Sequence, residues 1–224
     1  MKITMILPVY NESKTIGTML SQLDSLAGDW EILFADGGSR DDTIEQIGTR
    51  YRVLQSPKGR ANQMNHGAAN ASSEVLWFVH CDSRLPKDAH AQISRAIEEG
   101  KQWGCFHIGF DYNGPFMGFN TYFSNRRARK GIAFGDQGIW VRKDLFDATG
   151  GFPDLPIMED YEFSLGMQRK NIPITQLPGT IITSGRRYET RFPPLTMWQM
   201  FYLRCLYRRG TDIQEIARRY RDIR

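Results

Sequence analysis

The sequence predicts an α/β fold in which a mostly parallel open sheet is flanked by helices and followed by a helical tail. Over the first hundred residues, short apolar runs alternate with stretches that have helical spacing, and polar clusters follow several of these runs. This alternation favours right-handed β-α-β crossovers, which build a parallel sheet. With 224 residues, 41% of them hydrophobic and 24% charged, the chain is expected to form one core.

Four apolar runs in the first half are typical of strands, and each precedes a stretch typical of a helix. In the first helical stretch, Ile16, Leu20 and Leu23 fall on one face, and Asn11 or Ser13 is the candidate N-cap. The expected strands are residues 3–10, 30–39, 52–57 and 74–80, and the expected helices are residues 13–28, 41–51, 59–72 and 86–100.

Beyond about residue 100 the alternation loosens, and the second half is expected to complete the same sheet with an α+β pattern. The expected elements are a strand at 103–113, a helix at 116–131, a strand and short helix within 137–152, a helix at 158–171, and one or two strands within 172–185. The predicted organisation is a main domain at residues 1–190 and a basic amphipathic tail at residues 191–224.

Charge and cysteine content indicate the surroundings of the protein. The net charge is +4, and arginines concentrate in the tail, which suggests an anionic partner. The tail either packs on the domain, packs on a second copy in a homodimer, or lies on an anionic membrane surface. Nucleic acid is disfavoured because no recognisable binding module is present. Three scattered cysteines favour the reducing cytoplasm, and any membrane contact is expected to be peripheral, at the cytoplasmic face.

Polar clusters follow three of the predicted strands: "PVYNES", "ADGGSRDD" and "HCDS". Ligands of open parallel sheets bind beyond the carboxyl ends of the strands, although one such cluster alone is equally typical of a turn. Phosphates are compatible with a carboxylate-lined site when Mg²⁺ or Mn²⁺ lies between them. The sequence lacks the glycine-rich motifs of dinucleotide-binding and P-loop enzymes, so the phosphate is expected to be bound through a metal.

Five stretches in order, "PVYNES", "ADGGSRDDT", "GRANQMNHGA", "FVHCDS" and "MEDYEF", make the chain resemble the nucleotide-sugar-dependent glycosyltransferases of family 2, which have the GT-A fold. The resemblance covers roughly residues 1–190. More narrowly, "GDQGIWVRKDLFDATGGFPDLPIMEDYEFSLGMQR" with "SGRRYETRF" is similar to a small bacterial subgroup labelled arsenosugar-biosynthesis-type, or radical-SAM/selenodomain-associated, transferases.

The resemblance implies an inverting, metal-dependent enzyme that moves a hexose-type sugar from a nucleotide-diphosphate sugar, with UDP favoured, to a hydroxyl acceptor. Asp82 matches the family's metal-binding carboxylate. His80 stands where the family usually has an acid, so it either ligates a transition metal, favouring Mn²⁺ over Mg²⁺, or hydrogen-bonds a sugar hydroxyl. A strand-end histidine bonded to a backbone carbonyl is the structural alternative.

The resemblance also assigns donor-binding roles at the first strand ends. Asp36 matches the carboxylate that accepts the uracil N3–H, and Tyr10 with Pro8 matches the position that packs on the base. Glu12 is placed to reach the ribose, and Arg60 is a candidate for the phosphates or the base edge. The alternative for the acids is an ordinary helix N-terminus, where the helix dipole favours negative charge.

In "MEDYEF", Asp160 matches the family's catalytic base, and Glu159 beside it would orient the base or the acceptor. Two acids at a helix start are also ordinary complements of the helix dipole. Asp136 and Gln137, in "GDQG", are expected across the cleft, where they would meet the acceptor.

Arg186 and Arg187 suit the diphosphate as charge develops on it, or they are plain surface arginines. A sugar-1-phosphate nucleotidyltransferase is the alternative enzyme, but the loop after the first strand lacks the glycine-rich basic segment it requires. A nucleotide-sugar-binding module without turnover is the alternative that His80 suggests.

Overall fold

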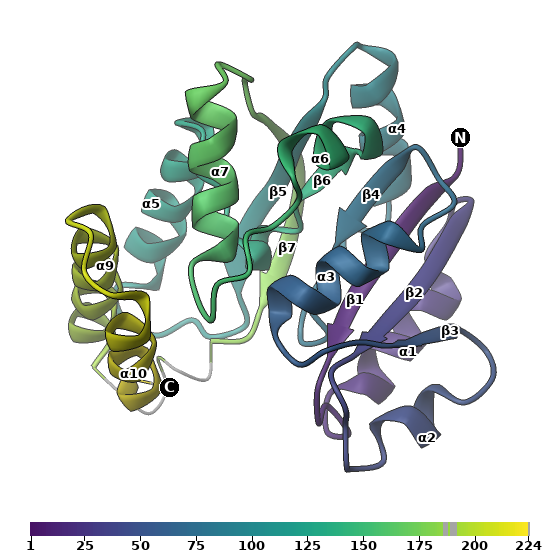
Figure 1. Cartoon of the computed structure of the whole chain (residues 1–224), viewed down its shortest axis with the longest axis horizontal. Coiled ribbons are helices and arrows are strands. Elements are labelled where there is room, and N and C mark those ends of the chain that lie inside the picture. The colour runs from purple at the N-terminus through teal and green to yellow at the C-terminus, as the bar shows by residue number, and fades with distance from the viewer. Residues whose placement is uncertain (186–187, 189–191, 224) are drawn as a thin grey trace.

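Seven strands form one open sheet in the order β3-β2-β1-β4-β6-β5-β7 (Figure 1). The computed structural model describes residues 1–185, 188 and 192–223, with side chains up to residue 220. The strands are β1 (Ile3–Val9), β2 (Trp30–Asp36), β3 (Arg52–Gln55), β4 (Val75–Phe78), β5 (Trp103–Phe110), β6 (Trp140–Arg142) and β7 (Thr175–Thr183).

The sheet is parallel except around β6, which runs antiparallel to both β4 and β5. This confirms the predicted α/β fold with a mostly parallel sheet. The stretch expected to give one or two strands forms the single strand β7, whose pairing with β5 shifts between Phe106 and His107. Phe106 faces Leu177 and His107 faces Thr180, so Pro178 and Gly179 are accommodated as a bulge.

Helices cover both faces of the sheet, as Figure 1 shows. The helices of the main domain are α1 (Ile16–Ser25), α2 (Thr43–Ile47), α3 (Arg60–Ala69), α4 (Ala89–Glu98), α5 (Met117–Arg129), the 3₁₀ turn η1 (Gly135–Gln137), α6 (Lys143–Thr149) and α7 (Glu159–Arg169). Helix α3 packs closely on β1 because its residues are small: a Cβ atom at Gly67 would lie 2.4 Å from Cγ2 of Ile6.

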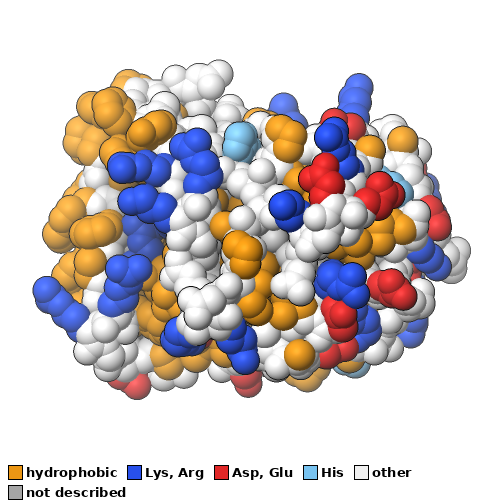
Figure 2. Space-filling model, turned by 90° about the horizontal axis from the view of Figure 1, so that it is seen from above, with side chains coloured by type: hydrophobic (Ala, Val, Ile, Leu, Met, Phe, Trp, Pro, Cys, Tyr) orange, Lys and Arg blue, Asp and Glu red, His pale blue; other side chains and the backbone are white. Residues whose placement is uncertain are grey.

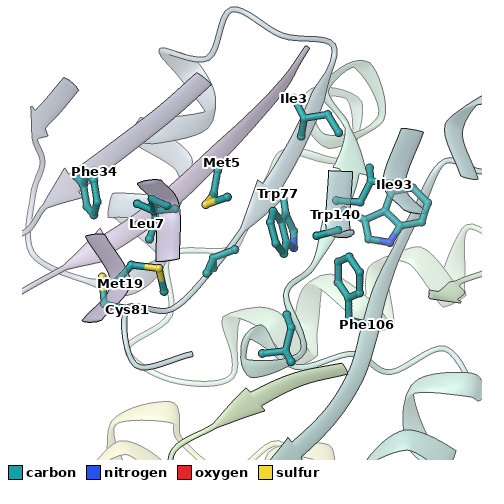
Figure 3. Close-up of a cluster of buried hydrophobic side chains, with 14 of the residues drawn as sticks. Ile3, Met5, Leu7, Met19, Phe34, Trp77, Cys81, Ile93, Phe106 and Trp140 are labelled. Carbon is teal, nitrogen blue, oxygen red and sulfur yellow. The ribbon is translucent and has the colours of Figure 1, made fainter. Parts of the chain in front are cut away.

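Alternation along the central strands divides the core into two layers. Leu7 of β1 and Trp77 of β4 lie in the layer covered by α1 and α4, which Figure 3 shows, whereas Ile6 and Phe78 lie in the layer covered by α3, α6 and α7. Strands buried on both faces explain the nearly continuous apolar runs in the sequence.

The tail forms α9 (Pro193–Arg208) and α10 (Ile213–Ile223), which lie beyond α5 and α7 in Figure 1. Leu203 of α9 and Ile216 of α10 pack with Ile132, Met158 and Tyr161 in a third apolar cluster. Among the described residues, no helix is both long enough and apolar enough to cross a bilayer.

The start of α1 differs from the sequence-based expectation. The helix begins at Ile16 with Thr15 as N-cap, and neither Asn11 nor Ser13 caps it. Asn11 instead adopts a left-handed conformation, and its Oδ1 accepts a hydrogen bond from the backbone N–H of Arg40 (2.8 Å). The side chain therefore joins the loop after β1 to the loop after β2.

Candidate active site

A cavity of about 530 Å³ lies at the carboxyl ends of β4 and β5. Of the three polar clusters that follow predicted strands, "HCDS" contributes to its described wall, and "PVYNES" and "ADGGSRDD" do not. Its wall contains five of the predicted site residues, which come from separate parts of the chain: Arg60, His80, Asp82, Asp136 and Asp160. Phe110, Phe134, Met158, Thr183, Ser184, Tyr188, Met200, Arg204 and Tyr220 are among the other lining residues.

Asp160 is held in one orientation at the start of α7. Its Oδ2 accepts a hydrogen bond from the backbone N–H of Gly135 (2.7 Å), and its Oδ1 accepts one from the N–H of Tyr161 (2.7 Å). Met158, the residue before the helix, is left-handed with φ 70°, which turns the chain into the helix at this point. Asp160 is 8% exposed, so the fixed carboxylate borders the cavity while most of its surface is covered.

Glu159 lies behind Asp160 and forms an ion pair with Arg60, at the start of α3. Glu159 is 1% exposed, and this burial raises the pKa of its carboxyl group despite the opposing charge of Arg60. The charge of Asp160 raises it further. Glu159 therefore fixes Arg60 at the cavity wall, where the side chain of Arg60 is 41% exposed.

Asp136 lies in η1, close to Asp160 along the cavity wall. Its Oδ1 is buried and has no hydrogen-bond partner among the described residues. Burial raises the pKa of Asp136 to about 6, and the charge of Asp160 adds to the effect while Arg127 opposes it. A carboxyl group with this pKa carries a proton for part of the time near neutral pH, so it can donate or accept a hydrogen bond.

His80 and Asp82 follow β4, and both line the cavity. The imidazole of His80 lies against the backbone of Gly135: a methyl group at position 135 would be 2.8 Å from Nε2 of His80 and 3.4 Å from Oδ2 of Asp160. The absence of a side chain at position 135 thus lets the imidazole and the carboxylate share one wall. Cys81 between them is buried in the core, as expected for the alternate position of an extended chain.

The donor atoms at the end of β4 fit a divalent ion held partly by substrate. Asp82 is exposed and makes no side-chain hydrogen bond or ion pair with a described residue. In the described parts of the chain, no three His, Cys, Asp or Glu residues gather closely enough to bind a metal by themselves. Mg²⁺ and Mn²⁺ are commonly held by one or two carboxylates together with water and phosphate oxygens. Asp82 supplies one such carboxylate, and His80 adds an imidazole nitrogen.

Gln137 does not reach the cavity, contrary to the expectation that it meets the acceptor. The residue is 0% exposed, its Nε2 donates to the carbonyl of Phe106 (3.4 Å), and its Oε1 accepts from Nη2 of Arg127 (2.9 Å). A 3₁₀ turn directs successive side chains to different sides, so Asp136 faces the cavity while Gln137 anchors the turn in the core.

None of the described residues that line the cavity comes from the loops after β1 and β2. Tyr10 is 36% exposed, and Nζ of Lys58 lies 3.9 Å from the centre of its ring. A hydrogen bond and the positive charge from Lys58 lower the pKa of Tyr10. Pro8 is half-buried opposite Ala35 in the parallel register. Lys58 thus lies over the ring, and the packing of Tyr10 on a nucleotide base stays a prediction.

Asp36 and Glu12 hold local structure in this part of the protein. Asp36 is 1% exposed and accepts hydrogen bonds from the N–H of Gly38 (3.1 Å) and from the N–H and hydroxyl of Ser39 (3.1 and 2.6 Å). Oε2 of Glu12 accepts from the hydroxyl of Thr15 (2.7 Å) at the start of α1. Their roles in binding uracil and ribose stay predictions. Arg186 and Arg187 lie outside the described residues.

Two arginines near the cavity were not singled out from the sequence. The guanidinium carbon of Arg127 lies 3.6 Å from the centre of the Phe134 ring, and that of Arg204 lies 5.7 Å from it. Burial lowers the pKa of Arg127 to about 10 and lowers that of Arg204 as well. The sequence segments that contain these arginines, "NRRARK" and "YLRCLYRR", are visibly basic. The Phe134 ring, which both arginines approach, comes from a third segment of the chain.

A second cavity, of about 470 Å³, lies between α5 and α9. It shares Phe134, Asp136 and Arg204 with the first cavity, so the two meet at η1. Phe123 of α5 and Phe201 of α9 also line it, and both are more than half exposed.

Comparison with known proteins connects these features. The family model described as "Glycosyl transferase family 2" matches residues 4–149, which is more than half of the chain. Dolichol-phosphate mannosyltransferase of Pyrococcus furiosus is 25% identical over 229 residues, covering 93% of this chain and 63% of the relative. Poly-beta-1,6-N-acetyl-D-glucosamine synthase of Staphylococcus aureus is 34% identical over 98 residues, covering 39% of this chain and 23% of the relative.

Solved structures share the fold. The structure of S. aureus TarS 1-349 in complex with UDP-GlcNAc superposes with a TM-score of 0.65 at 20% identity, covering 82% of this chain and 58% of the TarS 1-349 chain. The mannosyltransferase PcManGT of Pyrobaculum calidifontis, in complex with GDP-Man and Mn²⁺, gives a TM-score of 0.62 at 16% identity, covering 90% and 60%. These likenesses confirm the predicted GT-A fold. The chain spans less than two thirds of the length of each of these four proteins.

Proposed function

Because the chain belongs to glycosyltransferase family 2, we propose that it transfers a sugar from a nucleotide-diphosphate sugar to a hydroxyl acceptor, with a divalent metal ion and with inversion at the anomeric carbon. The observation that carries the proposal is the position of Asp160: a carboxylate fixed by two backbone N–H groups faces the cavity that Asp82, His80 and Arg60 also line.

The donor's diphosphate is assigned to the end of β4, next to Asp82. Asp82 and His80 would hold Mn²⁺ or Mg²⁺, and the described environment fits because the carboxylate is exposed and not engaged by another side chain. Such an ion, when bound, neutralises negative charge on the diphosphate. Arg60 is positioned by Glu159 to add a cationic contact to the same group. The complex of PcManGT with GDP-Man and Mn²⁺ supports this arrangement for a protein of the same fold.

Asp160 is assigned as the general base. As the acceptor oxygen bonds to the anomeric carbon and the bond from that carbon to the diphosphate oxygen breaks, the hydroxyl proton passes to Asp160. Attack on the face opposite the diphosphate inverts the anomeric configuration. The N–H groups of Gly135 and Tyr161 hold the carboxylate ready for the proton, so little reorganisation is needed during the step. Asp136, on the adjacent wall, is assigned to the acceptor.

The identity of the nucleotide rests on the loops after β1 and β2. The resemblance favours UDP through Asp36 and Tyr10, and the TarS complex with UDP-GlcNAc supports this choice. PcManGT is bound to GDP-Man, so proteins of this fold differ in nucleotide. Three finer predictions remain part of this proposal. They are membership of the arsenosugar-biosynthesis-type subgroup, a cytoplasmic location, and a boundary between the main domain and the tail at residue 190.

A binding panel tests the proposal. Purified protein is mixed with UDP-, GDP-, CDP- and dTDP-sugars with and without Mn²⁺, and the melting temperature is recorded, because a ligand that binds only the folded state must stabilise it. We expect a UDP-sugar to raise the melting temperature when Mn²⁺ is present. Asp82→Ala should abolish this increase, whereas Asp88→Ala, at an exposed acid just before α4, should retain it.

The assignment of the site fails if the Mn²⁺-dependent increase survives Asp82→Ala unchanged. A larger increase with a GDP-sugar than with any UDP-sugar would instead overturn only the choice of nucleotide. Proton NMR of the sugar product, which reports the anomeric configuration, checks inversion separately.

A further inference from the structure

An aromatic surface covers the outer side of α5 and α9. Its members, which we call the α5–α9 face, are Phe116, Phe119, Tyr122, Phe123, Phe192, Leu195, Trp198 and Phe201, each between 48% and 64% exposed. The rings of Phe116 and Phe192, which lie 6.2 Å apart, join the two helices. Figure 2 shows hydrophobic and basic side chains together at the end of the molecule where α9 lies in Figure 1. Exposed apolar groups gathered in this way mark an interaction site.

Helix α9 is nevertheless well anchored on its inner side. Thr196 is 0% exposed and Leu203 is 1% exposed, and Leu203 belongs to the third apolar cluster together with residues of α7 and α10. The helix therefore buries one face in the protein and presents Leu195, Trp198 and Phe201 on the other. Its apolar residues exceed what packing on the domain uses.

The charges on these helices have one sign. Neither α5, "MGFNTYFSNRRAR", nor α9, "PPLTMWQMFYLRCLYR", contains an aspartate or glutamate. Their C-terminal ends carry exposed cations: Arg126, Arg129, Lys130, Arg208 and Arg209. Aromatic side chains next to a row of cations suit the boundary between acyl chains and anionic head groups.

We propose that the α5–α9 face docks on the surface of an anionic lipid bilayer. A second copy of the chain is the less suitable partner. A two-fold interface would bring the same patch of both copies together, so the arginines of both copies would gather there with no acid on either helix to pair with them. Anionic lipid supplies the missing charge and also accepts the aromatic rings.

Docking would bring the second cavity to the membrane. Phe123 and Phe201 belong both to the α5–α9 face and to the wall of this cavity, which meets the reaction cavity at Phe134 and Asp136. An amphiphilic acceptor in the leaflet would then have a short path, lined by rings and by Arg204, to the reaction cavity. This last step rests on the proposed function, whereas the docking itself does not.

Co-sedimentation with vesicles tests the docking. The intact protein is mixed with phosphatidylcholine vesicles that contain either no anionic lipid or about one third phosphatidylglycerol. We expect binding to the anionic vesicles only, weakened by added salt because surface charges are screened. The double variants Phe119→Ser with Trp198→Ser and Arg126→Gln with Arg129→Gln should each bind about tenfold more weakly. Lys87→Gln with Arg95→Gln, two exposed cations near α4 on the other side of the sheet, is the charge-matched control.

Trp198 offers a direct spectroscopic readout. It is 58% exposed, whereas Trp77, Trp103 and Trp140 are each 0% exposed. On anionic vesicles its fluorescence should shift to shorter wavelength and lose accessibility to iodide, and Trp198→Phe should abolish this response.

The proposal is overturned if wild type and the aromatic variant bind anionic vesicles equally. It is also overturned if the protein ignores the vesicles and forms a dimer that the aromatic variant dissociates, because that result assigns the face to a second copy. If the protein binds the vesicles but binds none of the nucleotide sugars, the docking proposal stands and the proposed function alone is refuted.

Discussion

Asp36, at the end of β2, and Asp41, in the loop after it, each accept several hydrogen bonds from nearby backbone and hydroxyl groups. Asp136 and Glu159, in the second half, are surrounded by protein with fewer such bonds. The electrostatic outcome is opposite. The hydroxyl of Thr43 is the main cause that lowers the pKa of Asp41 to about 2, while burial raises the pKa of Asp136 to about 6.

The difference teaches that acids at the carboxyl edge of a sheet serve two purposes. In the loop after β2 such an acid accepts hydrogen bonds that tie loops together, as Asp41 does when it accepts from the N–H of Ser13 (3.1 Å) in the loop after β1. In the second half, burial raises the pKa of Asp136 at the cavity wall and that of Glu159 behind it, which makes both groups easier to protonate. Five substitutions, taken in order of expected effect, test this contrast.

Asp160→Asn should have the largest effect. Without a carboxylate to accept the hydroxyl proton, turnover of the donor should fall by about 10²–10⁴-fold, while the Kd of the donor stays unchanged. Steady-state kinetics and calorimetric binding of the nucleotide sugar measure the two quantities. Glu162→Gln, at an acid two residues further along α7 that pairs with Arg169 and does not line the cavity, is the matched control. Turnover within a few-fold of wild type would remove Asp160 from its role.

Gly135→Ala should follow. The added methyl group would lie 2.8 Å from Nε2 of His80, so the imidazole or η1 must move, and a displacement of this kind can cost about 10²-fold in turnover. Gly166→Ala places a methyl group in α7 itself, with only Nη2 of Arg169 at 4.0 Å, and should leave kinetics unchanged. Equal turnover for the two variants would mean that the wall shared by His80 and Asp160 is unimportant.

Asp136→Asn and Asp41→Asn should change stability in opposite directions. In wild type the unfolded chain ionises near the ordinary aspartate pKa of 3.8 and folded Asp136 only near 6, so Asp136 makes the protein less stable as the pH rises through this window. Asp136→Asn removes that cost and should stabilise the protein at pH 7 by about 1–2 kcal/mol. For Asp41 the folded pKa is about 2, so its stabilising contribution is present above about pH 4 and is lost as the pH falls toward 2.

Asp41→Asn should therefore lower the melting temperature at pH 7 and have little effect at pH 2. Urea unfolding at a series of pH values follows both variants. If both variants changed stability in the same direction at pH 7, the proposed contrast between Asp41 and Asp136 would be wrong.

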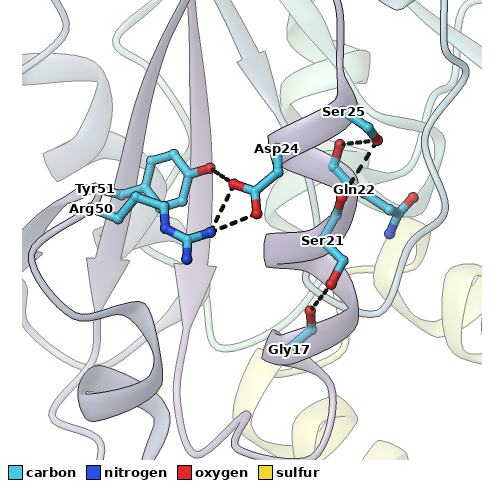
Figure 4. A network of polar contacts seen from close by, with 7 residues as sticks. All are labelled: Gly17, Ser21, Gln22, Asp24, Ser25, Arg50 and Tyr51. Carbon is cyan, nitrogen blue, oxygen red and sulfur yellow. Dashed lines mark hydrogen bonds and ion pairs between the residues drawn. The ribbon is translucent and has the colours of Figure 1, made fainter.

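Asp24→Asn should have the smallest effect. Figure 4 shows Asp24 of α1 accepting from Arg50 (2.8 and 2.6 Å) and from the hydroxyl of Tyr51 (3.0 Å). These groups lie at the surface, where water and salt weaken ion pairs, so the melting temperature should change less than for any variant above. A decrease in melting temperature as large as that caused by Asp41→Asn would contradict this. It would show that the number of hydrogen bonds sets the stability, whether or not the acid links the loops after β1 and β2.

The sequence predicted the sheet well because strands buried on both faces are apolar throughout, and helices follow them regularly. The predicted start of α1 was wrong because Asn11 or Ser13 was expected to cap the helix. The side chain of Asn11 instead accepts a hydrogen bond from the N–H of Arg40, in the loop after β2. The site was predicted as far as motifs reach: Asp82, Asp136 and Asp160 do share one cavity. Gln137 was misplaced because the 3₁₀ turn, which sends neighbours to opposite sides, has no clear sequence pattern.

Other features depend on contacts between segments far apart in the chain. Arg127 and Arg204 meet only because Phe134 lies between α5 and α9, and the sequence gives no spacing that links the three. The membrane alternative for the tail was open in the sequence because an amphipathic helix can bury its apolar face anywhere. The structure adds that α9 has apolar residues on both sides, one packed and one exposed.

Carbon-13 NMR of the aspartate carboxyl groups in the metal-free protein, titrated from pH 2 to pH 8 and assigned with the Asp41→Asn and Asp136→Asn variants, measures the contrast most directly. The account predicts a midpoint near 6 for Asp136 and near 2 for Asp41. Midpoints for both residues near the ordinary aspartate pKa of 3.8 would contradict it.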